Sequence, residues 1–172
     1  LDNQNLNKIF SLLPPDDPIS RFSIFFKGLS KTKVKESLHR LRMSREEKRL
    51  IENIVDFLNF VSNGPKSEQW TDEEIRRSLD LNQLNVEESI NLIEASDLNA
   101  KDFLDSLESL KSRENLISFE PSLTAKQLMV LLNLEPGPLV GEILRWLKEI
   151  HLRDGPISAD EERNMVMEQW GK

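Results

Sequence analysis

The chain has no cysteine and only 6 glycines among its 172 residues. The absence of cysteine excludes disulfides, zinc knuckles, iron–sulfur clusters and a cysteine nucleophile. So few glycines leave little material for the positive-φ turns of a meandering β protein. An Asp-x-Asp pair is also missing, although two-metal nucleotidyl transfer depends on paired carboxylates. The sequence therefore favours a helical binding module or one part of a larger enzyme.

Long hydrophobic segments are missing as well. No apolar run approaches the ~20 residues needed to span a bilayer, and the N-terminus lacks the basic-then-apolar pattern of a signal peptide. We therefore expect no membrane partner. A cysteine-free composition suits a reducing compartment, which predicts a cytoplasmic location, with an organelle as the alternative. The chain begins without Met, and this indicates a fragment or a processed product.

The net charge of −7 hides an asymmetry along the chain. Residues 1–50 carry 11 Lys or Arg against 6 Asp or Glu, whereas residues 51–172 carry 12 against 24. Most of the basic charge lies between Arg21 and Arg49, where 10 basic residues accompany 3 acids. If the protein has an anionic partner, we expect it to bind this segment first. The alternative is ordinary solvated charge around an apolar helix stripe.

Helix signals recur along the sequence. Ser44, Thr71, Thr124 and Ser158 each begin a capping box, in which a Glu or Gln three residues later reaches back to the helix start. Apolar residues repeat at helical spacing between these signals, and no convincing strand alternation is present. The predicted fold class is therefore all-α, without a β-sheet. We expect helices over about residues 5–13, 18–26, 32–41, 44–63, 71–79, 86–95, 99–113, 124–132, 138–150 and 158–170.

One stretch breaks the helical pattern. Glu114–Ser122 has no clear period and contains Pro121, a residue that disrupts helix interiors. We interpret this stretch as the linker between two helical subdomains. The predicted body subdomain spans residues 1–116, and the predicted tail subdomain spans residues 117–172.

The sequence contains no recognisable catalytic or metal site. His39 and His151 have no carboxylate or second histidine at metal-ligand spacing, so we expect both on the solvated faces of amphipathic helices. The run Glu73–Arg77 combines carboxylates with arginines, a pattern typical of an exposed helix face. No P-loop or G-x-G-x-x-G is present. We therefore predict no catalytic residue and no metal ligand in this chain.

The basic segment is the first candidate RNA-binding site. Its cations spread over two predicted helices and the turn between them, an arrangement that can follow a phosphate backbone, with counterion release favouring each contact. The residues that we predict to bind RNA in this segment are Lys31, Lys33, Lys35, Arg40, Arg42 and Arg45.

The turn Pro136–Pro138 is the second candidate. Gly137 lets the backbone turn, and Pro138 fixes φ at a helix start. Gly141 leaves the first helical turn without a side chain. Since free N–H groups at a helix start suit a phosphate, we add Gly137 and Gly141 to the predicted RNA-binding residues. The alternative is that Gly141 permits close packing of another helix.

Four segments share their patterns with one known family. Pro136–Leu144 reads Pro-Gly-Pro-x-x-Gly-x-Ile-Leu, and Asp154–Ile157 follows it at a suitable distance. Leu123–Met129 has a small-residue helix start and then Leu-Met, with Gln127 where the family more usually has an acid. Leu38–Glu47 is similar to a Leu-Arg-x-Leu-Arg-x-Ser segment. Together these segments resemble the C-terminal part of bacterial-type tRNA nucleotidyltransferases, the CCA-adding enzymes with their A-adding and poly(A) polymerase relatives.

The resemblance implies a division of labour. In that family a head domain carries the metal-binding carboxylates and uses Mg²⁺ with ATP or CTP, and a neck reads the incoming nucleotide. Helical body and tail domains hold the tRNA, and this chain resembles the body and tail alone. The resemblance thus implies a non-catalytic, tRNA-binding part that binds no cofactor of its own. It would position the acceptor arm and elbow for CCA, CC or A addition by the head and neck of the parent protein.

Two alternatives stay open at this point. A helical protein–protein interaction module without an RNA role would fit the acidic net charge and the apolar candidates Trp70 and Trp170, which we expect to be exposed. In the second alternative the chain belongs to the same family, but its main role is to form a homo-oligomer and not to bind RNA. Binding to tRNA separates the first alternative from the main hypothesis, and light scattering tests the second.

Overall fold

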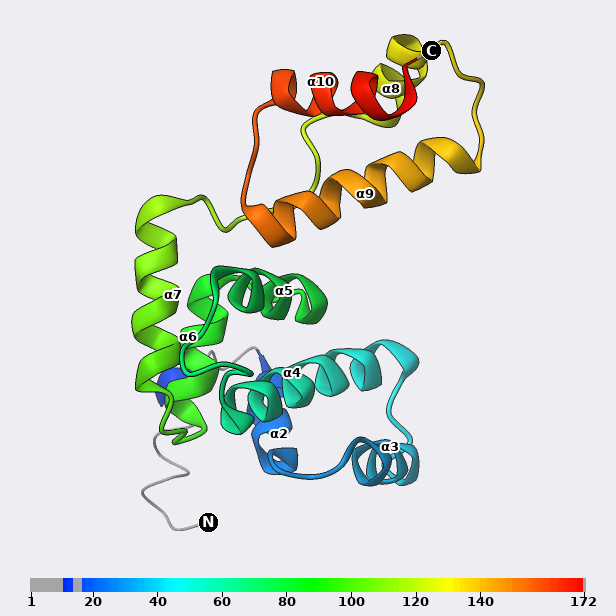
Figure 1. Cartoon of the computed structure of the whole chain (residues 1–172). Coiled ribbons are helices and arrows are strands. Elements are labelled where there is room, and N and C mark those ends of the chain that lie inside the picture. Colours follow the sequence, from blue (N-terminus) through cyan, green and yellow to red (C-terminus); the bar gives the residue numbers. More distant parts are fainter. Residues whose placement is uncertain (1–10, 14–16, 172) are drawn as a thin grey trace. The chain divides into compact units, whose positions relative to one another are not determined.

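The computed structural model describes residues 11–13 and 17–171 (Figure 1). These residues form α-helices and one short 3-10 helix, with no strand among them, so the predicted all-α fold is confirmed. The helix expected over residues 5–13 lies mostly outside the described residues. The elements are α2 (Pro18–Ser23), η1 (Ile24–Phe26), α3 (Lys31–Arg40), α4 (Arg45–Asn63), α5 (Asp72–Asn82), α6 (Val86–Ala95), α7 (Lys101–Arg113), α8 (Ala125–Leu132), α9 (Pro138–Asp154) and α10 (Ala159–Trp170).

The chain divides into two compact units. The first unit comprises residues 1–110 and the second unit residues 111–172, so that the end of α7 belongs to the second. The predicted assignment of residues 1–116 to a body and 117–172 to a tail stays a prediction about how the family's subdomains map onto this chain.

Capping boxes start most of the longer helices. The four predicted boxes are all present: the side chains at Ser44, Thr71, Thr124 and Ser158 accept the backbone N–H three residues on, and the Glu or Gln there returns the bond. A fifth box, with Asn85 as the cap, starts α6. Each box satisfies two N–H groups that a helix start would otherwise leave unpaired.

The core of the first unit forms around α4, which packs against α2, α3 and α5. One buried cluster joins Val34 and Leu38 of α3 to Ile51 and Val55 of α4. Elsewhere in the unit, aromatic side chains fill the interior, with Phe57 and Trp70 both in edge-to-face contact with Phe103 of α7. The ring centroids of these two pairs lie 5.9 and 5.1 Å apart.

The second unit is a three-helix assembly. Its buried cluster draws on all three helices, and α8 packs against both α9 and α10. Trp146 of α9 and Trp170 of α10 meet edge to face with their centroids 4.8 Å apart. The buried residues of the cluster are Leu123, Leu128, Val140, Ile143, Leu147 and Val166.

Candidate nucleic-acid interface

The orientation of α3 decides which basic side chains face solvent. Val34 and Leu38 are buried, because they form the side of α3 that packs on α4. Lys33 and Arg40 are seven residues apart, about two helical turns, and therefore share one side of the helix. Both are exposed, on the side that faces away from α4.

Two of the predicted RNA-binding lysines lean toward α4 instead. Nζ of Lys31 lies 2.7 Å from Oδ2 of Asp56, and Nζ of Lys35 lies 3.9 Å from Oε2 of Glu52. The hydrogen bond to Asp56, together with its charge, raises the pKa of Lys31 above its ordinary value. Each of these two lysines therefore has a nearby carboxylate of α4 that partly compensates its charge.

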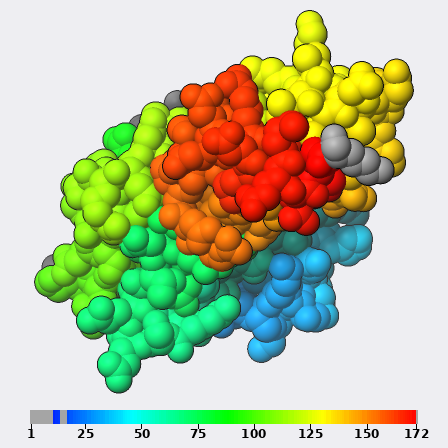
Figure 2. Space-filling model, turned by 45° about the horizontal axis from the view of Figure 1, so that its top comes forward, coloured from blue at the N-terminus to red at the C-terminus, as the bar shows by residue number. Residues whose placement is uncertain are grey.

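The other four predicted cations form what we call the α3 basic face: Lys33, Arg40, Arg42 and Arg45. All four are exposed, and no ion pair joins them to any residue that the structure describes. Arg42 adopts a left-handed backbone with φ of 53°, and its N–H donates to the carbonyl of His39 over 3.2 Å. This turn carries the basic face from α3 to the start of α4. Figure 2 shows the light-blue part of the chain, which includes α3, at the surface.

Other cations of the basic segment hold the fold together. The ammonium of Lys27 donates to the carbonyl of Ser96. The guanidinium of Arg49 lies 2.6 Å from Oε1 of Glu46 and donates to the side chain of Gln83 over 2.6 Å. Fewer cations are therefore available to a partner than the sequence suggests, and these cations lie on α3 and in the turn after it.

The two predicted glycines differ in what the structure requires of them. Gly137 caps α9 with an extended backbone that any residue can adopt. A Cβ on Gly141 would meet no atom within 4 Å, apart from its own helix backbone and neighbours, among the described residues. Since no helix packs on it, the interpretation of Gly141 as a helix-packing residue finds no support here. The exposed first turn of α9 stays available for an outside partner.

The two histidines occupy opposite environments. His39 is exposed, as expected, but the prediction for His151 is wrong, since it is buried. His151 faces Glu162 of α10, whose side chain is also fully buried. The sequence contains a signal that we missed: Glu162 lies one turn before the buried Val166 and so falls on the inner face of α10.

The run Glu73–Arg77 combines surface and interior positions. Arg77 pairs with Glu73 over 2.8 Å on the surface, and Glu74 closes the capping box of α5. Arg76 is only 3 % exposed and lies 3.9 Å from Asp72. The expectation of an exposed face is therefore wrong for Arg76.

Trp70 and Trp170 do not form the exposed apolar surface expected of them. Trp70 is buried between Phe60 and Phe103. Trp170 is half-buried against Trp146. The protein–protein alternative therefore loses the apolar evidence on which it rested.

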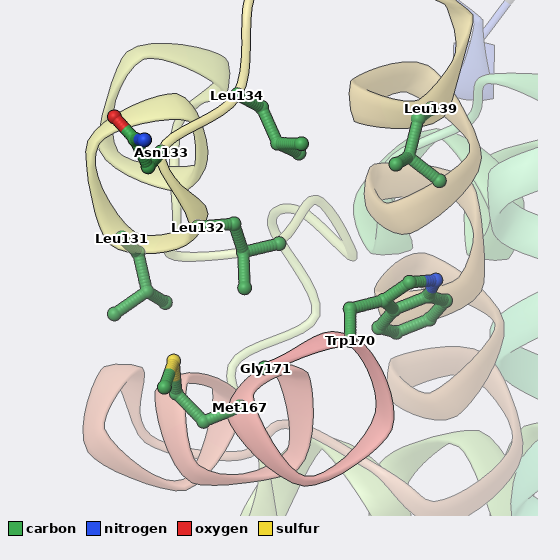
Figure 3. Close-up of a pocket in the computed structure, with 8 residues that line it drawn as sticks. All are labelled: Leu131, Leu132, Asn133, Leu134, Leu139, Met167, Trp170 and Gly171. Carbon is green, nitrogen blue, oxygen red and sulfur yellow. The ribbon is translucent and has the colours of Figure 1, made fainter.

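The second unit nevertheless contains an apolar hollow, drawn in Figure 3. Leu131, Leu132 and Leu134 line one side, and Leu139 of α9 and Trp170 of α10 lie opposite them. Met167 of α10 lies below Leu131 in this view. The volume of the hollow is about 400 Å³. Asn133 contributes the one polar side chain to the lining, so that the hollow suits an apolar group better than a phosphate.

The described part of the chain has neither a cluster of metal-ligating side chains nor a membrane-spanning helix. No group of three or more His, Asp or Glu side chains there could hold a metal ion. Among the same residues, no helix combines the length and apolar character that crossing a membrane requires.

Comparison with known proteins identifies the family. The profile described as tRNA nucleotidyltransferase domain 2 matches residues 19–155, which is most of the chain. No curated protein and no solved structure matches. The chain therefore belongs to the tRNA nucleotidyltransferase domain 2 family, and the resemblance to the body and tail of these enzymes is confirmed.

Proposed function

We propose that this chain is the non-catalytic, tRNA-binding part of a tRNA nucleotidyltransferase. It would position the acceptor arm and elbow of tRNA while a separate head adds CCA, or CC or A alone, to the 3′ end. Membership of the family supports a role connected with tRNA. The observation that carries the binding role is the α3 basic face, where four exposed cations have no acid partner among the described residues.

The α3 basic face has the chemistry that a phosphate backbone requires. Lys33 and Arg40 stand about 10 Å apart along α3, and Arg42 and Arg45 extend the row through the turn. Arginine can hold a phosphate with two parallel hydrogen bonds, whereas lysine acts as a point charge. Such contacts fix position without reading sequence, which suits a protein that accepts many tRNAs.

The chemistry would belong to other parts of the parent protein. Mg²⁺ and ATP or CTP would bind to the head, and the partners of this chain would be tRNA together with the head and neck. A cytoplasmic location follows as part of the same proposal. With tRNA, Mg²⁺, ATP and CTP, the chain alone is expected to add no nucleotide.

The direct test is the affinity for tRNA, measured by fluorescence anisotropy at several salt concentrations. We expect a steep salt dependence, because each neutralised phosphate contributes about 0.7–0.9 to the slope of log K against log salt. A variant with Lys33, Arg40 and Arg42 all changed to Gln should bind more weakly and with a slope smaller by about 2–3.

A matched variant controls for net charge. Changing Lys101, Lys126 and Arg163 to Gln removes the same three charges from other helices, and it should leave the salt slope nearly unchanged. Equal losses in the two variants, or tRNA binding that ignores salt, would defeat the RNA assignment.

Self-association is the second candidate function. Val130 is 78 % exposed, and Met167 and Leu139 at the apolar hollow are 44 % and 37 % exposed. Light scattering of the chain over a range of concentrations tests it. A dimer that Val130→Ser and Met167→Ser abolish together would favour this candidate, and a monomer at every concentration would exclude it.

A further inference from the structure

A second hollow, of about 540 Å³, lies within the first unit. It is bordered by the start of α3, by α4 and α5, and by the loop between these two helices. Unlike the hollow in the second unit, it combines apolar, amide and charged side chains, and the charged ones include the carboxylates of Asp56 and Glu74 as well as three cations. Its volume falls in the range of small-molecule sites.

The apolar part of this hollow is formed by Phe60 and Leu81. Phe60 is half-buried, and the centroid of its ring lies 5.0 Å from that of Trp70, with the two ring planes tilted by 53°. Leu81 is 73 % exposed near the end of α5. An aromatic ring beside an exposed leucine offers a flat apolar platform, the kind of surface on which nucleobases stack.

Two amides provide hydrogen-bonding groups beside this platform. Asn53 is half-buried, and its side-chain amide makes no hydrogen bond with any residue that the structure describes. Asn82 donates from Nδ2 to the carbonyl of Ser78 over 2.7 Å, which leaves its Oδ1 as an acceptor. A side-chain amide carries both donors and acceptors, so the two residues can match the edge of a base.

Three cations from three separate elements border the same hollow: Lys31, Lys66 and Arg77. Lys66 is exposed and forms no ion pair with a described residue, and its backbone N–H donates to Oε1 of Glu74 over 3.2 Å. Lys31 lies 2.7 Å from Asp56, and its side chain is 61 % exposed. Ion pairs at such exposed positions are weak, so a phosphate can compete with Asp56 for Lys31.

We propose that this hollow binds one unpaired nucleotide of an RNA strand. The base would stack on Phe60 and Leu81, Asn53 and Asn82 would contact its edge, and Lys66 with its neighbouring cations would hold the phosphate. The hollow lies at the N-terminal end of α3, and the α3 basic face extends from the same helix to the turn after it. That the nucleotide belongs to RNA rests on the proposed function, whereas the nucleotide site itself rests on the hollow.

The test uses mononucleotides, with the side-chain amide signals of Asn53 and Asn82 and the indole signal of Trp70 observed by NMR. AMP and CMP should shift these signals in a saturable manner. Adenosine lacks the phosphate and inorganic phosphate lacks the base, so each should bind about tenfold more weakly than AMP. Phe60→Leu and Lys66→Gln should each weaken AMP binding about tenfold, in line with the loss of base stacking or of one charged contact.

The control is Lys101→Gln, which removes an equal charge from α7 and should leave AMP binding unchanged. Circular dichroism of each variant confirms that the helices are retained. The proposal is wrong if the three signals stay fixed with AMP, or if inorganic phosphate alone reproduces the shifts. Equal weakening by Lys101→Gln would also overturn it, because simple charge attraction would then suffice.

Failure of this site and failure of the proposed function give different results. The Lys33/Arg40/Arg42 variant should lose tRNA affinity and keep AMP binding. Phe60→Leu should weaken AMP binding and keep most of the salt-dependent tRNA affinity. AMP binding without tRNA binding would support the site and reject the function, and tRNA binding without AMP binding would reject the site alone.

Discussion

Nε2 of His151 lies 2.8 Å from Oε1 of Glu162, with both side chains buried. The carboxylate of Glu162 also accepts the backbone N–H groups of Ser122 and Leu123, each over 2.8 Å. One acid of α10 thereby connects α9 to the segment that precedes α8. Three charge-assisted or polar contacts satisfy a group that would be costly to bury alone.

Glu162→Ala is therefore expected to destabilise the second unit strongly. The change leaves His151 and two backbone N–H groups without their acceptor in the interior, which should lower the free energy of unfolding by about 3 kcal/mol or more. Hydrogen exchange of the full chain measures the stability of each unit separately. Amide protection should fall in α8, α9 and α10, whereas the protection of α4 should stay unchanged.

An exposed acid of the same helix provides the comparison. Glu168 lies on the outside of α10, so Glu168→Ala should change the free energy of unfolding by no more than about 0.5 kcal/mol. If Glu162→Ala changed the free energy of unfolding as little as Glu168→Ala, the buried contacts of Glu162 would not stabilise the second unit.

Lys33 and Lys35 provide a matched pair on one helix. Both are exposed lysines of α3, but Lys35 lies 3.9 Å from Glu52 whereas Lys33 has no acid partner among the described residues. Lys33→Gln should therefore reduce tRNA affinity and the salt slope, by about 0.7–0.9 if one phosphate contact is lost. Lys35→Gln should reduce them less. A larger effect at Lys35 would contradict the assignment of the α3 basic face.

The capping glutamates predict how the helix starts respond to acid. Hydrogen bonds from the side chain and backbone of Ser44 lower the pKa of Glu47 below 4.5, and those from Ser158 do the same for Glu161. A lowered folded pKa means that the stabilisation is present above the ordinary pKa and is lost as the pH falls through the folded value. The starts of α4 and α10 should therefore fray as the pH falls below the ordinary pKa of glutamate and through the lowered folded value.

The equivalent box of α8 contains its own control. Gln127 takes the place of the glutamate there and cannot titrate in this range. As the pH falls from 5 to 3, the protection factors of the backbone amides should decrease at the starts of α4 and α10 before they do at α8. Simultaneous loss of protection at all three helix starts would show that capping does not set the acid response.

How much the sequence predicts depends on the range of the interaction. Helix starts were predicted well because a capping box is complete within four residues, as at Ser44 and Ser158. The cap at Asn85 was missed, although it obeys the same rule. His151 and Trp70 were placed on the surface wrongly, because their burial depends on partners far away in the chain.

The candidate site shows the same limit. Composition identified the basic segment, but it could not separate Lys33 from Lys35, because that depends on which side of α3 meets α4. No local pattern points to Lys66 or Phe60, since the hollow that they share is assembled from elements separated in sequence. Local patterns give helices and charge density, and tertiary packing decides which charges remain available.

Gly141→Ala separates a structural role from a binding role at the start of α9. The added methyl group meets no atom within 4 Å apart from its own helix, and the backbone is that of an ordinary helical residue. Alanine should therefore raise the free energy of unfolding by about 0.5–1 kcal/mol. If RNA approaches the bare first turn, as the sequence predicts, the same change should weaken tRNA binding. Chemical denaturation and anisotropy on the same variant test both expectations, and a stabilised chain with unaltered tRNA affinity would remove Gly141 from the RNA-binding surface.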